Sequence, residues 1–539
     1  MHAISTPVAP LQSSLIQALM NREAYPHPVE KVELLETHIS WVLLAGDYAY
    51  KIKKPVALGF LDFSNLDDRR HFCEEEVRLN RKWAPEIYLG VVTVTNDTAL
   101  RIEGGGTVIE YAVQMRRFPQ ESRLDQQLQA GKLDEEDMVE LAEMVAAAQQ
   151  SAAPLDESEL QHYLAFTRDA MLENFDFILG RFDESVIKRL RSWTRSELQR
   201  LQPLLVARFR EGRVRECHGD LHLANLVRLA SGIHAFDCIE FNADLRNTDV
   251  SCDSSFLVMD LISRERRDLA FAFLNRYLEV TGDYASLGLF NLFFVYRCMV
   301  RAKVAAIRAE ERDLSDPAGA ADIATVRMYC ELAETQIGER EPMLILMHGL
   351  SASGKTWAAG RLMTALPAIR LRSDIERKRL HGLSETADSG SPVAGGIYSQ
   401  QASDELYGHL LRLAWSVLRA GHDVIIDATF ARHLWRKNAA SLAHEANAEF
   451  AIVETVAPLE ALRCRLLRRA TAGGDVSEAT RAVLDYQLEH TEPLTPWEQS
   501  LSLTWRTDDG TSADTVVALL RRLKVQELAA TSLPDRPER

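Results

Sequence analysis

Cysteine is scarce in this sequence, and its few copies stand far apart. Seven cysteines occur among 539 residues, none of them in a Cys-x-x-Cys pair: Cys73, Cys217, Cys238, Cys252, Cys298, Cys330 and Cys464. An odd number of isolated cysteines argues against a disulfide framework and against a zinc site. The pattern is typical of proteins in a reducing compartment.

The sequence also lacks a long apolar run, a basic leader and an excess of positive charge. No apolar run approaches the ~20 residues that cross a bilayer. The opening MHAISTPVAPLQSS has no basic segment followed by an apolar core. We therefore expect a cytoplasmic protein with no membrane partner. The net charge of −16 disfavours nucleic acid as a main partner, although a local basic patch would still permit it.

What is present is the composition of a soluble globular protein, with 46% hydrophobic and 26% charged residues. At roughly 150 residues per domain, the length predicts about two to four structural units. The sequence leaves the oligomeric state open.

The pattern of apolar residues divides the chain into two parts. Strand signals dominate from about 29 to 118, with a hairpin turn at Gly46-Asp47, and helical signals dominate from about 133 to 335. After the polar junction GEREPM (338–343), strands and helices alternate, which predicts an α/β domain with a parallel sheet and right-handed crossovers. The predicted limits are a loosely held lead-in (1–24), an α+β first domain (25–337), an α/β second domain (338–524) and a disordered tail (525–539).

A polar octapeptide, HGDLHLAN (218–225), lies between helical segments and a short strand. It fits the pattern H-x-D-L-x-x-x-N of a kinase catalytic loop, in which a carboxylate serves the attacking hydroxyl and an amide or second carboxylate holds Mg²⁺. On this pattern Asp220 accepts or orients the hydroxyl proton, and Asn225 and Asp237 hold the metal. The alternative is a satisfied polar turn in which Asp220 acts as a local cap.

A lysine on an upstream strand adds to this constellation. Lys51 in the segment YAYK has the small-x-Lys form that presents a lysine to the α- and β-phosphates of ATP. Lys53 lies on the same face of the strand and is its rival. A carboxylate on the next helix should pair with the lysine, and we choose Glu76 over Glu74 and Glu75 because Glu76 lies on the apolar face of that helix.

HGDLHLAN, followed by AFDCIEFN and DLRNTDVSCD, resembles the aminoglycoside phosphotransferase family, which has a protein-kinase-like fold, over roughly residues 25–310. The resemblance implies a bilobal domain with a β-rich small lobe (25–117), a helical large lobe (118–337), and ATP in the cleft near Gln114 and Met115. It also implies the roles given above for Asp220, Asn225, Asp237 and Lys51. One departure is the missing G-x-G-x-x-G loop, in whose place stands ETHISWVLL, so the phosphate cover and the activity of this domain are open questions.

Four other polar residues near the octapeptide have simpler interpretations. His218 is expected to hold the loop together. Asp244, Asp249 and Asp253 could attract a cationic substrate, but we expect them to cap helices.

A second phosphate-binding motif, GLSASGKT (349–356), has the P-loop form G-x-x-x-x-G-K-T between a strand and a helix. Backbone N–H groups of such a loop and of the helix N-terminus cradle phosphate oxygens. Lys355 reaches the β- and γ-phosphates, and Thr356 binds Mg²⁺. The predicted nucleotide-binding residues are Gly349, Ser351, Ser353, Gly354, Lys355 and Thr356.

Further signals point to a small kinase. Asp374 and Arg377 lie one helical turn apart after the second strand, and Asp427 ends the third strand beside the P-loop, where it can hold Mg²⁺. Arginines on the helix that ends near Gly473-Gly474 would suit a lid, unless they form an ordinary solvated face. The glycine-rich segment 384–396 is a candidate for closing over an acceptor.

Residues 341–522 resemble the branch of P-loop kinases that contains gluconate kinase, zeta toxin and polynucleotide 5′-kinase. The resemblance implies Asp374 as general base, Arg377 as a clamp on substrate or transition state, and a lid arginine among Arg465, Arg468 and Arg469. We choose Arg468 and Arg469. The two parts in this order resemble fused bacterial proteins with an aminoglycoside phosphotransferase-like domain and a P-loop kinase domain.

The sequence therefore predicts two ATP- and Mg²⁺-dependent phosphotransferases in tandem. Each is expected to move the γ-phosphoryl group of ATP to a hydroxyl of a small molecule, such as a sugar or nucleotide-sugar. One alternative is a nucleotide or polynucleotide 5′-hydroxyl kinase. Another is that the first domain is a pseudokinase-like regulator that senses ATP.

Overall fold

The computed structural model describes residues 10–58, 61–179, 182, 184–312, 317–338, 340–472, 476–508 and 512–521. By its internal contacts the chain divides into two compact units, Met1–Met171 with Leu205–Asp260, and Leu172–Leu204 with Leu261–Arg539. The predicted disordered tail (525–539) and the first nine residues lie outside the described ranges. Within those ranges, no helix has the length and apolar character needed to cross a bilayer.

The first unit begins with a six-stranded antiparallel sheet of order β1-β2-β3-β8-β6-β7. Its strands are β1 (Val32–Glu36), β2 (Ser40–Ala45), β3 (Tyr48–Lys53), β6 (Tyr88–Asn96), β7 (Leu100–Ile102) and β8 (Thr107–Arg116). The predicted hairpin at Gly46-Asp47 is confirmed, since Ala45 pairs with Tyr48 across the turn. The short strands β4 (Ala57–Leu58) and β5 (Leu61–Asp62) lead into helix α2 (Leu66–Asn80), which is capped by the side chain of Asn65.

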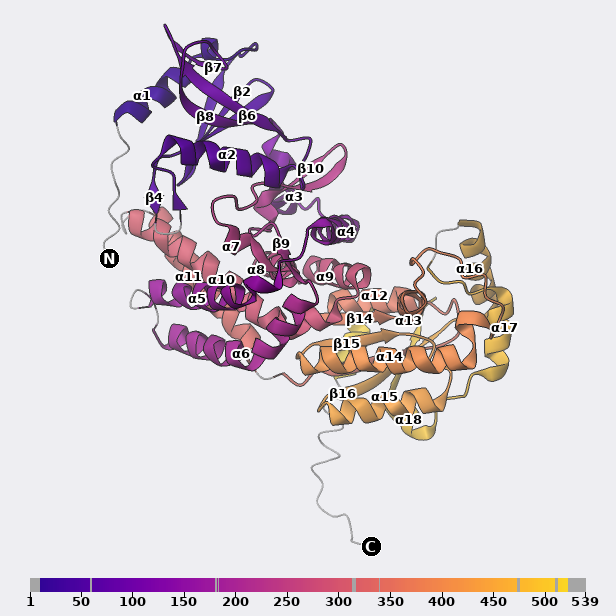
Figure 1. The fold of residues 1–539 in the computed structure, drawn as a ribbon. Helices are drawn as coiled ribbons and strands as arrows, with labels where there is room; N and C mark the ends of the chain where they lie inside the picture. The colour runs from indigo at the N-terminus through magenta and orange to yellow at the C-terminus, as the bar shows by residue number, and fades with distance from the viewer. Residues whose placement is uncertain are drawn as a thin grey trace. The chain divides into compact units, whose positions relative to one another are not determined.

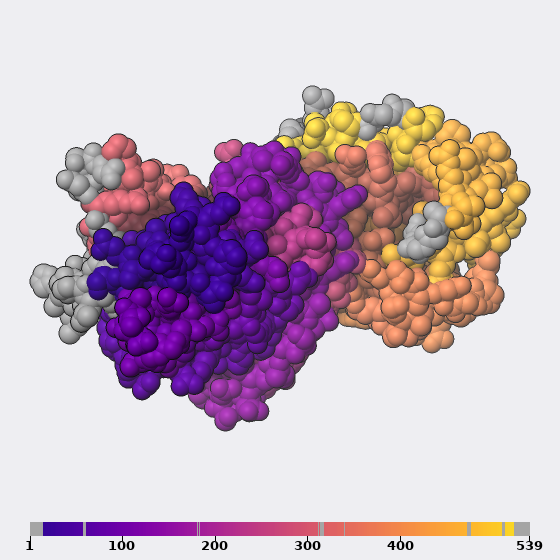
Figure 2. All heavy atoms as spheres, turned by 90° about the horizontal axis from the view of Figure 1, so that it is seen from above, coloured from indigo at the N-terminus to yellow at the C-terminus, as the bar shows by residue number. Residues whose placement is uncertain are grey.

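The outer face of this sheet is covered by residues that the sequence assigned to a loose lead-in. Helix α1 (Pro10–Leu19) and the short η1 (Arg22–Ala24) bring Leu15, Ile16 and Leu19 into one apolar core with Tyr50 and Ile52 of β3. The expectation of a loosely held lead-in is therefore wrong from residue 10 onward, because an apolar stripe on α1 seals the sheet. This lobe forms the indigo surface in Figure 2.

Helices make up most of the remainder of the first unit. They are η2 (Gln120–Ser122), α3 (Leu124–Gln129), α4 (Glu135–Ser151), η3 (Glu157–Glu159), α7 (Ala243–Arg246) and α8 (Val250–Ser263), with α5 (Leu160–Ile178) and α6 (Glu184–Arg210) contributing to both units. Two small antiparallel pairs, β9 (Val214–Glu216) with β12 (Asn247–Asp249) and β10 (Leu226–Leu229) with β11 (Gly232–Ala235), frame HGDLHLAN and the short η4 (Leu223–Asn225). The octapeptide thus connects β9 of one pair to β10 of the other.

The second unit contains a five-stranded parallel sheet of order β14-β15-β13-β16-β17, as the alternation of strands and helices predicted. Its strands are β13 (Met343–His348), β14 (Ala368–Arg372), β15 (Asp423–Asp427), β16 (Glu449–Val456) and β17 (Ser502–Arg506). Helix α12 (Lys355–Ala365) and residues 513–521 pack on one face, and α14 (Gln400–Arg419) and α15 (His433–Glu445) cover the other (Figure 1).

Further elements connect these strands. They are α13 (Ser373–Leu380), η6 (Gly396–Tyr398), α16 (Leu459–Ala472), α17 (Arg481–His490) and α18 (Pro496–Ser500). The helices α9 (Arg267–Thr281), η5 (Tyr284–Ser286), α10 (Leu287–Glu311) and α11 (Pro317–Ile337) precede the sheet in sequence and belong to the same compact unit. The P-loop fold is therefore packed together with helices that the sequence placed in the first domain.

Candidate active sites

In the first unit, Lys51 of β3 contacts two carboxylates from distant segments. Its Nζ lies 2.8 Å from Glu76 Oε1 on α2 and 2.6 Å from Asp237 Oδ1 in the segment after β11. The Asp237 side chain is 47% exposed, so a ligand can reach this end of the arrangement. The structure thus joins three residues that the sequence had proposed separately.

The rival lysine, Lys53, occupies a different environment. Its side chain is fully buried, donates to Glu76 Oε2 at 2.7 Å and forms an ion pair with Glu240. Both carboxylate partners are buried as well. Of the two lysines, Lys51 is the one paired with a solvent-accessible carboxylate, and this geometry favours Lys51 as the phosphate ligand.

The two lysines determine the charge state of Glu76. Burial opposes ionisation of this carboxyl, but Lys51 and Lys53 outweigh it and lower the pKa of Glu76 to about 2. Burial also works against the charge on Lys51, yet Asp237 and Glu76 hold its pKa well above the ordinary value. The site therefore carries fixed charges at neutral pH.

Asp220 and Asn225 meet within the catalytic-loop candidate. Asn225 Nδ2 donates to Asp220 Oδ2 at 2.9 Å and to the Asp220 carbonyl at 3.0 Å. His222 Nε2 lies 3.4 Å from the same carboxylate. The Asp220 side chain is 36% exposed.

Buried groups fix the backbone of this loop. Asp253 accepts hydrogen bonds from the N–H groups of His218 (2.7 Å) and Gly219 (3.0 Å), and Asp260 accepts from Leu223 N–H (3.0 Å). His218 bonds the Phe236 carbonyl at 3.0 Å, and burial lowers its pKa. These contacts hold the Asp220 segment against the Asp237 segment.

The expectation that the later aspartates cap helices holds only for Asp249. This residue accepts from Ser251 N–H (2.9 Å) at the start of α8 and also pairs with buried Arg208 (2.7 Å). Asp253 instead orients the catalytic-loop candidate, because it lies in α8 directly behind His218 and Gly219. Asp244 bonds His162 at 2.8 Å.

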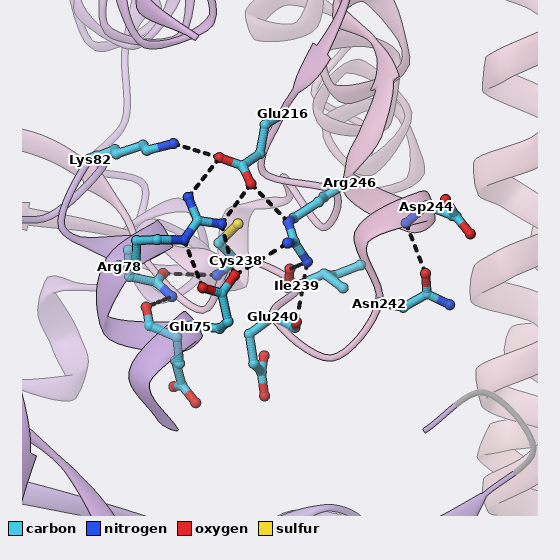
Figure 3. A network of polar contacts seen from close by, with 12 residues as sticks. Glu75, Arg78, Lys82, Glu216, Cys238, Ile239, Glu240, Asn242, Asp244 and Arg246 are labelled. Atoms are coloured by element: carbon cyan, nitrogen blue, oxygen red, sulfur yellow. Dashed lines mark hydrogen bonds and ion pairs between the residues drawn. The ribbon is translucent and has the colours of Figure 1, made fainter. Parts of the chain in front are cut away.

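A polar network joins α2 to the segment that carries Asp237. Asn80 Oδ1 accepts from Cys238 N–H at 2.9 Å, while Asn80 Nδ2 donates to the Glu76 carbonyl at 2.9 Å. Figure 3 shows Arg78 between Glu75 and Glu216, at 2.8 and 2.7 Å. Glu216 also contacts Lys82 (2.5 Å) and Arg246 (3.3 Å). These contacts hold the helix of Glu76 in register with Asp237, whose backbone adopts a positive φ of 62°.

The predicted adenine-contacting residues lie on opposite faces of β8. Gln114 pairs with Tyr50 and donates to its hydroxyl at 3.2 Å, on the face covered by α1. Met115 pairs with Ala49, on the face that carries Lys51. Strand alternation therefore turns the Gln114 side chain away from the face that carries Lys51.

In the second unit, the segment GLSASGKT forms a tight loop between β13 and α12. Gly349 and Gly354 have φ values of 139° and 96°, and a Cβ on Gly349 would lie 2.5 Å from the Thr455 carbonyl oxygen. Lys355 Nζ donates to the carbonyls of Gly349 and Leu350, both at 2.9 Å. The lysine therefore folds back over the loop, in the place where phosphate oxygens would lie.

Side chains of the loop differ in their surroundings. Ser353 is buried and shares a 2.6 Å hydrogen bond with Thr455, so only its backbone is available to a phosphate. Ser351 N–H donates to Gln487 Oε1 at 2.7 Å. Thr356 hydrogen-bonds Asp427, whose pKa is raised by burial although nearby arginines oppose this. Thr356 and Asp427 are oxygen donors of the kind that Mg²⁺ prefers, as are Asn225 and Asp237 in the first site.

The P-loop itself lines a cavity of about 640 Å³, together with residues of several loops and helices. Asp374 and Arg377 of α13 line it, and Arg377 Nη1 donates to the Ile397 carbonyl at 2.6 Å. The Arg377 guanidinium lies 4.7 Å from the ring centre of Tyr398. Part of the glycine-rich segment, residues 391–394, forms another wall.

The lid arginines separate into those that line the cavity and one that does not. Arg465 lines it and donates to the Ala352 carbonyl (3.1 Å) and to Thr507 Oγ1 (2.9 Å), so it braces the P-loop. Arg469, one turn later, also lines the cavity. The choice of Arg468 is not supported: its side chain is exposed and stands outside the lining, because the helix turns it outward.

Sequence reasoning missed several residues at both sites. Glu240 carried no motif, and only its position three residues after Asp237 could have drawn attention. Glu478 lines the cavity and accepts from Ser389 N–H (3.0 Å) and Ser389 Oγ (2.5 Å), which ties the segment after α16 to the glycine-rich segment. Such pairs of residues far apart in sequence leave no local pattern.

The chain therefore combines an antiparallel-sheet lobe and helices with an α/β fold that carries a P-loop. Residues 344–494 match the family model for an AAA domain (AAA_33). The chain is 30% identical over 466 residues to the uncharacterized proteins Rv2004c of Mycobacterium tuberculosis (strain ATCC 25618 / H37Rv) and Mb2027c of Mycobacterium bovis (strain ATCC BAA-935 / AF2122/97). The match covers 85% of this chain and 91% of each of those proteins. The chain belongs to the family of these mycobacterial proteins.

Solved structures show weaker similarity, each to one part of the chain. Choline kinase of Cryptosporidium parvum Iowa II is 13% identical, with a TM-score of 0.36, over 60% of this chain and 97% of that one. A gluconokinase of Sinorhizobium meliloti 1021 is 18% identical, with a TM-score of 0.26, over 36% of this chain and 100% of that one. The strand orders and site contacts described above define the two folds independently of these similarities.

Proposed function

We propose that the protein binds ATP and Mg²⁺ at two sites, and that each site transfers the γ-phosphoryl group to a hydroxyl of a small molecule. The observation that supports this proposal is that each site brings a lysine together with carboxylates from distant segments. Lys51 contacts Glu76 and Asp237 in the first, and Lys355 lines one cavity with Asp374 and Asp427 in the second.

At the first site, Lys51 would contact the α- and β-phosphates while Glu76 holds the lysine in place. Asn225 and Asp237 would supply oxygen ligands for Mg²⁺, which neutralises phosphate charge when it is bound. A bond forms between the acceptor oxygen and the γ-phosphorus as the bond to the β–γ bridging oxygen breaks. ADP leaves, and the hydroxyl proton passes to Asp220.

At the second site, P-loop N–H groups and Lys355 would hold the phosphates, and Thr356 and Asp427 would hold Mg²⁺. Asp374 would accept the acceptor proton, and Arg377 would clamp the acceptor or the transferring group. Arg465 and Arg469 reach the cavity from the lid side. The cavity of about 640 Å³ is lined by P-loop residues as well as by Asp374 and Arg377, so it would hold the nucleotide phosphates together with the acceptor. Tyr398, Tyr407 and Trp435 in its lining support a sugar or nucleotide-sugar as acceptor.

The first site could instead sense ATP, because the turn joining β1 to β2 spans only residues 37–39 and no glycine-rich cover stands there. Asp220→Asn separates the two roles. If the site is catalytic, this variant should bind ATP like the wild type but lose about 10²–10⁴-fold in transfer, because general-base catalysis is worth that much.

The direct test incubates the full chain with γ-labelled ATP and a panel of sugars, nucleotide-sugars and 5′-hydroxyl oligonucleotides. Lys51→Met and Lys355→Ala should each remove one class of product and one of two bound nucleotides by calorimetry. A single nucleotide per wild-type chain would contradict the two-site proposal. Labelling of oligonucleotides alone, lost in Lys355→Ala and kept in Asp220→Asn, would instead establish a 5′-kinase with a regulatory first domain.

A further inference from the structure

Helix α9 closes the free edge of the P-loop sheet. Strand β14 lies at the end of the five-stranded order, so its outer backbone groups have no strand partner. The buried carboxamide of Asn275 hydrogen-bonds to two of these backbone groups instead. Asn275 Nδ2 donates to the Ala368 carbonyl at 3.0 Å, and Asn275 Oδ1 accepts from Arg370 N–H at 2.6 Å. A side chain of α9 thus takes the place of a neighbouring strand.

One turn further along α9, Glu279 fixes the carboxyl end of the same strand. Its side chain is 2% exposed and accepts from Arg370 at 2.7 Å. Arg372, the last residue of β14, lies 3.8 Å from the other oxygen of the same carboxylate. Because a buried carboxylate needs such partners, Glu279 and the end of β14 hold each other. Arg372 lines the cavity, and the next two residues, Ser373 and Asp374, begin α13.

Arg276, on the same helix, holds the start of the glycine-rich segment. Its guanidinium makes two parallel hydrogen bonds to the Glu385 carboxylate, at 2.7 and 2.9 Å. The segment is held further along by the contact between Ser389 and Glu478. Residues 391–394, which follow, form a wall of the cavity.

We propose that α9 positions the acceptor side of the P-loop site, with Glu279 holding the β14–α13 junction and Arg276 holding the 384–396 segment. Both act through other residues, so they are positioning residues. The site would then be incomplete without a helix that precedes the P-loop in sequence and belongs to the same compact unit. The inference rests on the proposed function of this cavity, but its test does not measure transfer.

The experiment compares full-length Arg276→Gln and Glu385→Gln by amide hydrogen exchange. Each variant removes one partner of the bidentate pair, so exchange in peptides covering 384–398 should rise about tenfold in both. The double variant should add nothing to Arg276→Gln, because that change alone already removes the pair with Glu385; Arg276 also lies 3.8 Å from Glu279. ADP affinity at the P-loop site, measured in a Lys51→Met background, should stay within about twofold, since the contact lies away from the nucleotide.

A matched control is Arg266→Gln, at the start of the same helix, where Arg266 pairs only with Asp268 in the described contacts, at 2.8 Å. It should leave exchange in 384–398 unchanged. Equal exchange in Arg276→Gln and Arg266→Gln would overturn the proposal. A loss of ADP affinity like that in Lys355→Ala would also overturn it, because α9 would then act on the nucleotide side. Absence of phosphotransfer by the wild type would contradict the proposed function. The exchange experiment would still test whether α9 holds the 384–396 segment, because it does not measure transfer.

Discussion

The two candidate sites of this chain, both proposed to bind ATP, are built in different ways. The first is assembled from side chains that lie far apart in sequence: Lys51 on a strand, Glu76 on a helix and Asp237 on a loop, joined by ion pairs of 2.6–2.8 Å. The second is assembled mainly from backbone, where glycines with φ values of 139° and 96° let the loop between β13 and α12 turn tightly. Lys355 then adds one side chain, which donates to the Gly349 and Leu350 carbonyls at 2.9 Å.

This difference has a consequence for stability. Each charge buried in the first site is stabilised by its partner, because an unpaired buried charge would lower the free energy of unfolding. Its binding residues are therefore also part of what holds the unit folded. The P-loop depends on backbone torsion angles that a Cβ would disturb. The Ser353 side chain is turned inward to Thr455, so this residue offers a ligand only its backbone. Substitutions should reveal the two designs separately.

The largest effect is expected for Lys53→Met in the first unit. The change leaves Glu76 and Glu240 buried with one fewer cation, and breaking a buried ion pair in this way costs about 3–5 kcal/mol. Chemical denaturation followed by a probe in the first unit measures it. Arg70→Met on α2 is the control, since Arg70 pairs at 2.9 Å with Glu74, both side chains are about half exposed, and such a pair contributes about 0–1 kcal/mol. Equal losses in both variants would contradict the role given to the buried network.

A smaller effect is expected for Gly349→Ala in the second unit. The new Cβ would meet the Thr455 carbonyl oxygen at 2.5 Å in a backbone conformation that alanine rarely adopts, so nucleotide affinity at the P-loop should fall roughly ten- to hundredfold. Calorimetry in a Lys51→Met background isolates this site. Gly360→Ala, in the interior of α12 where the nearest atom would be 3.5 Å away, should leave affinity unchanged and stabilise the helix by about 0.5–1 kcal/mol. Unchanged affinity in Gly349→Ala would refute the backbone account.

The sequence could predict those parts of both sites that have local patterns. HGDLHLAN, GLSASGKT, the hairpin at Gly46-Asp47 and the parallel sheet all depend on residues near one another in the chain. It could not predict the partners of Lys53 and Arg370, because Glu240 and Glu279 are 187 and 91 residues away from them and have no fixed spacing. The lead-in was missed for another reason. The apolar stripe of α1 is short, and the helix is ordered because that stripe packs against the sheet.

Lys355 and Lys51 should respond differently to pH, and the smallest expected effect therefore comes from comparing ligand binding at the two sites as the pH rises. Burial lowers the pKa of Lys355 from 10.5 to about 8, although Asp427 and Asp374 oppose the shift. Lys51, paired with Asp237 and Glu76, has its pKa held well above 10.5 and stays charged. Above pH 8 the free P-loop site therefore holds a neutral lysine, and ATP, which needs the charged form, must bind together with a proton.

ATP affinity at the P-loop site should accordingly be constant below about pH 7 and fall by up to about tenfold per pH unit above 8. Stability should respond to Lys355 in the opposite direction: between pH 8 and 10.5 the unfolded chain binds more protons at this group than the folded chain, so its contribution to the unfolding free energy rises with pH. Calorimetry of Lys51→Met in buffers of different ionisation enthalpy should give uptake approaching one proton per ATP near pH 9. Lys355→Ala, which leaves the first site, should show neither the uptake nor the fall in affinity. Proton uptake of equal size in both variants would mean that Lys355 is not its source, and the contrast drawn between the two lysines would fail.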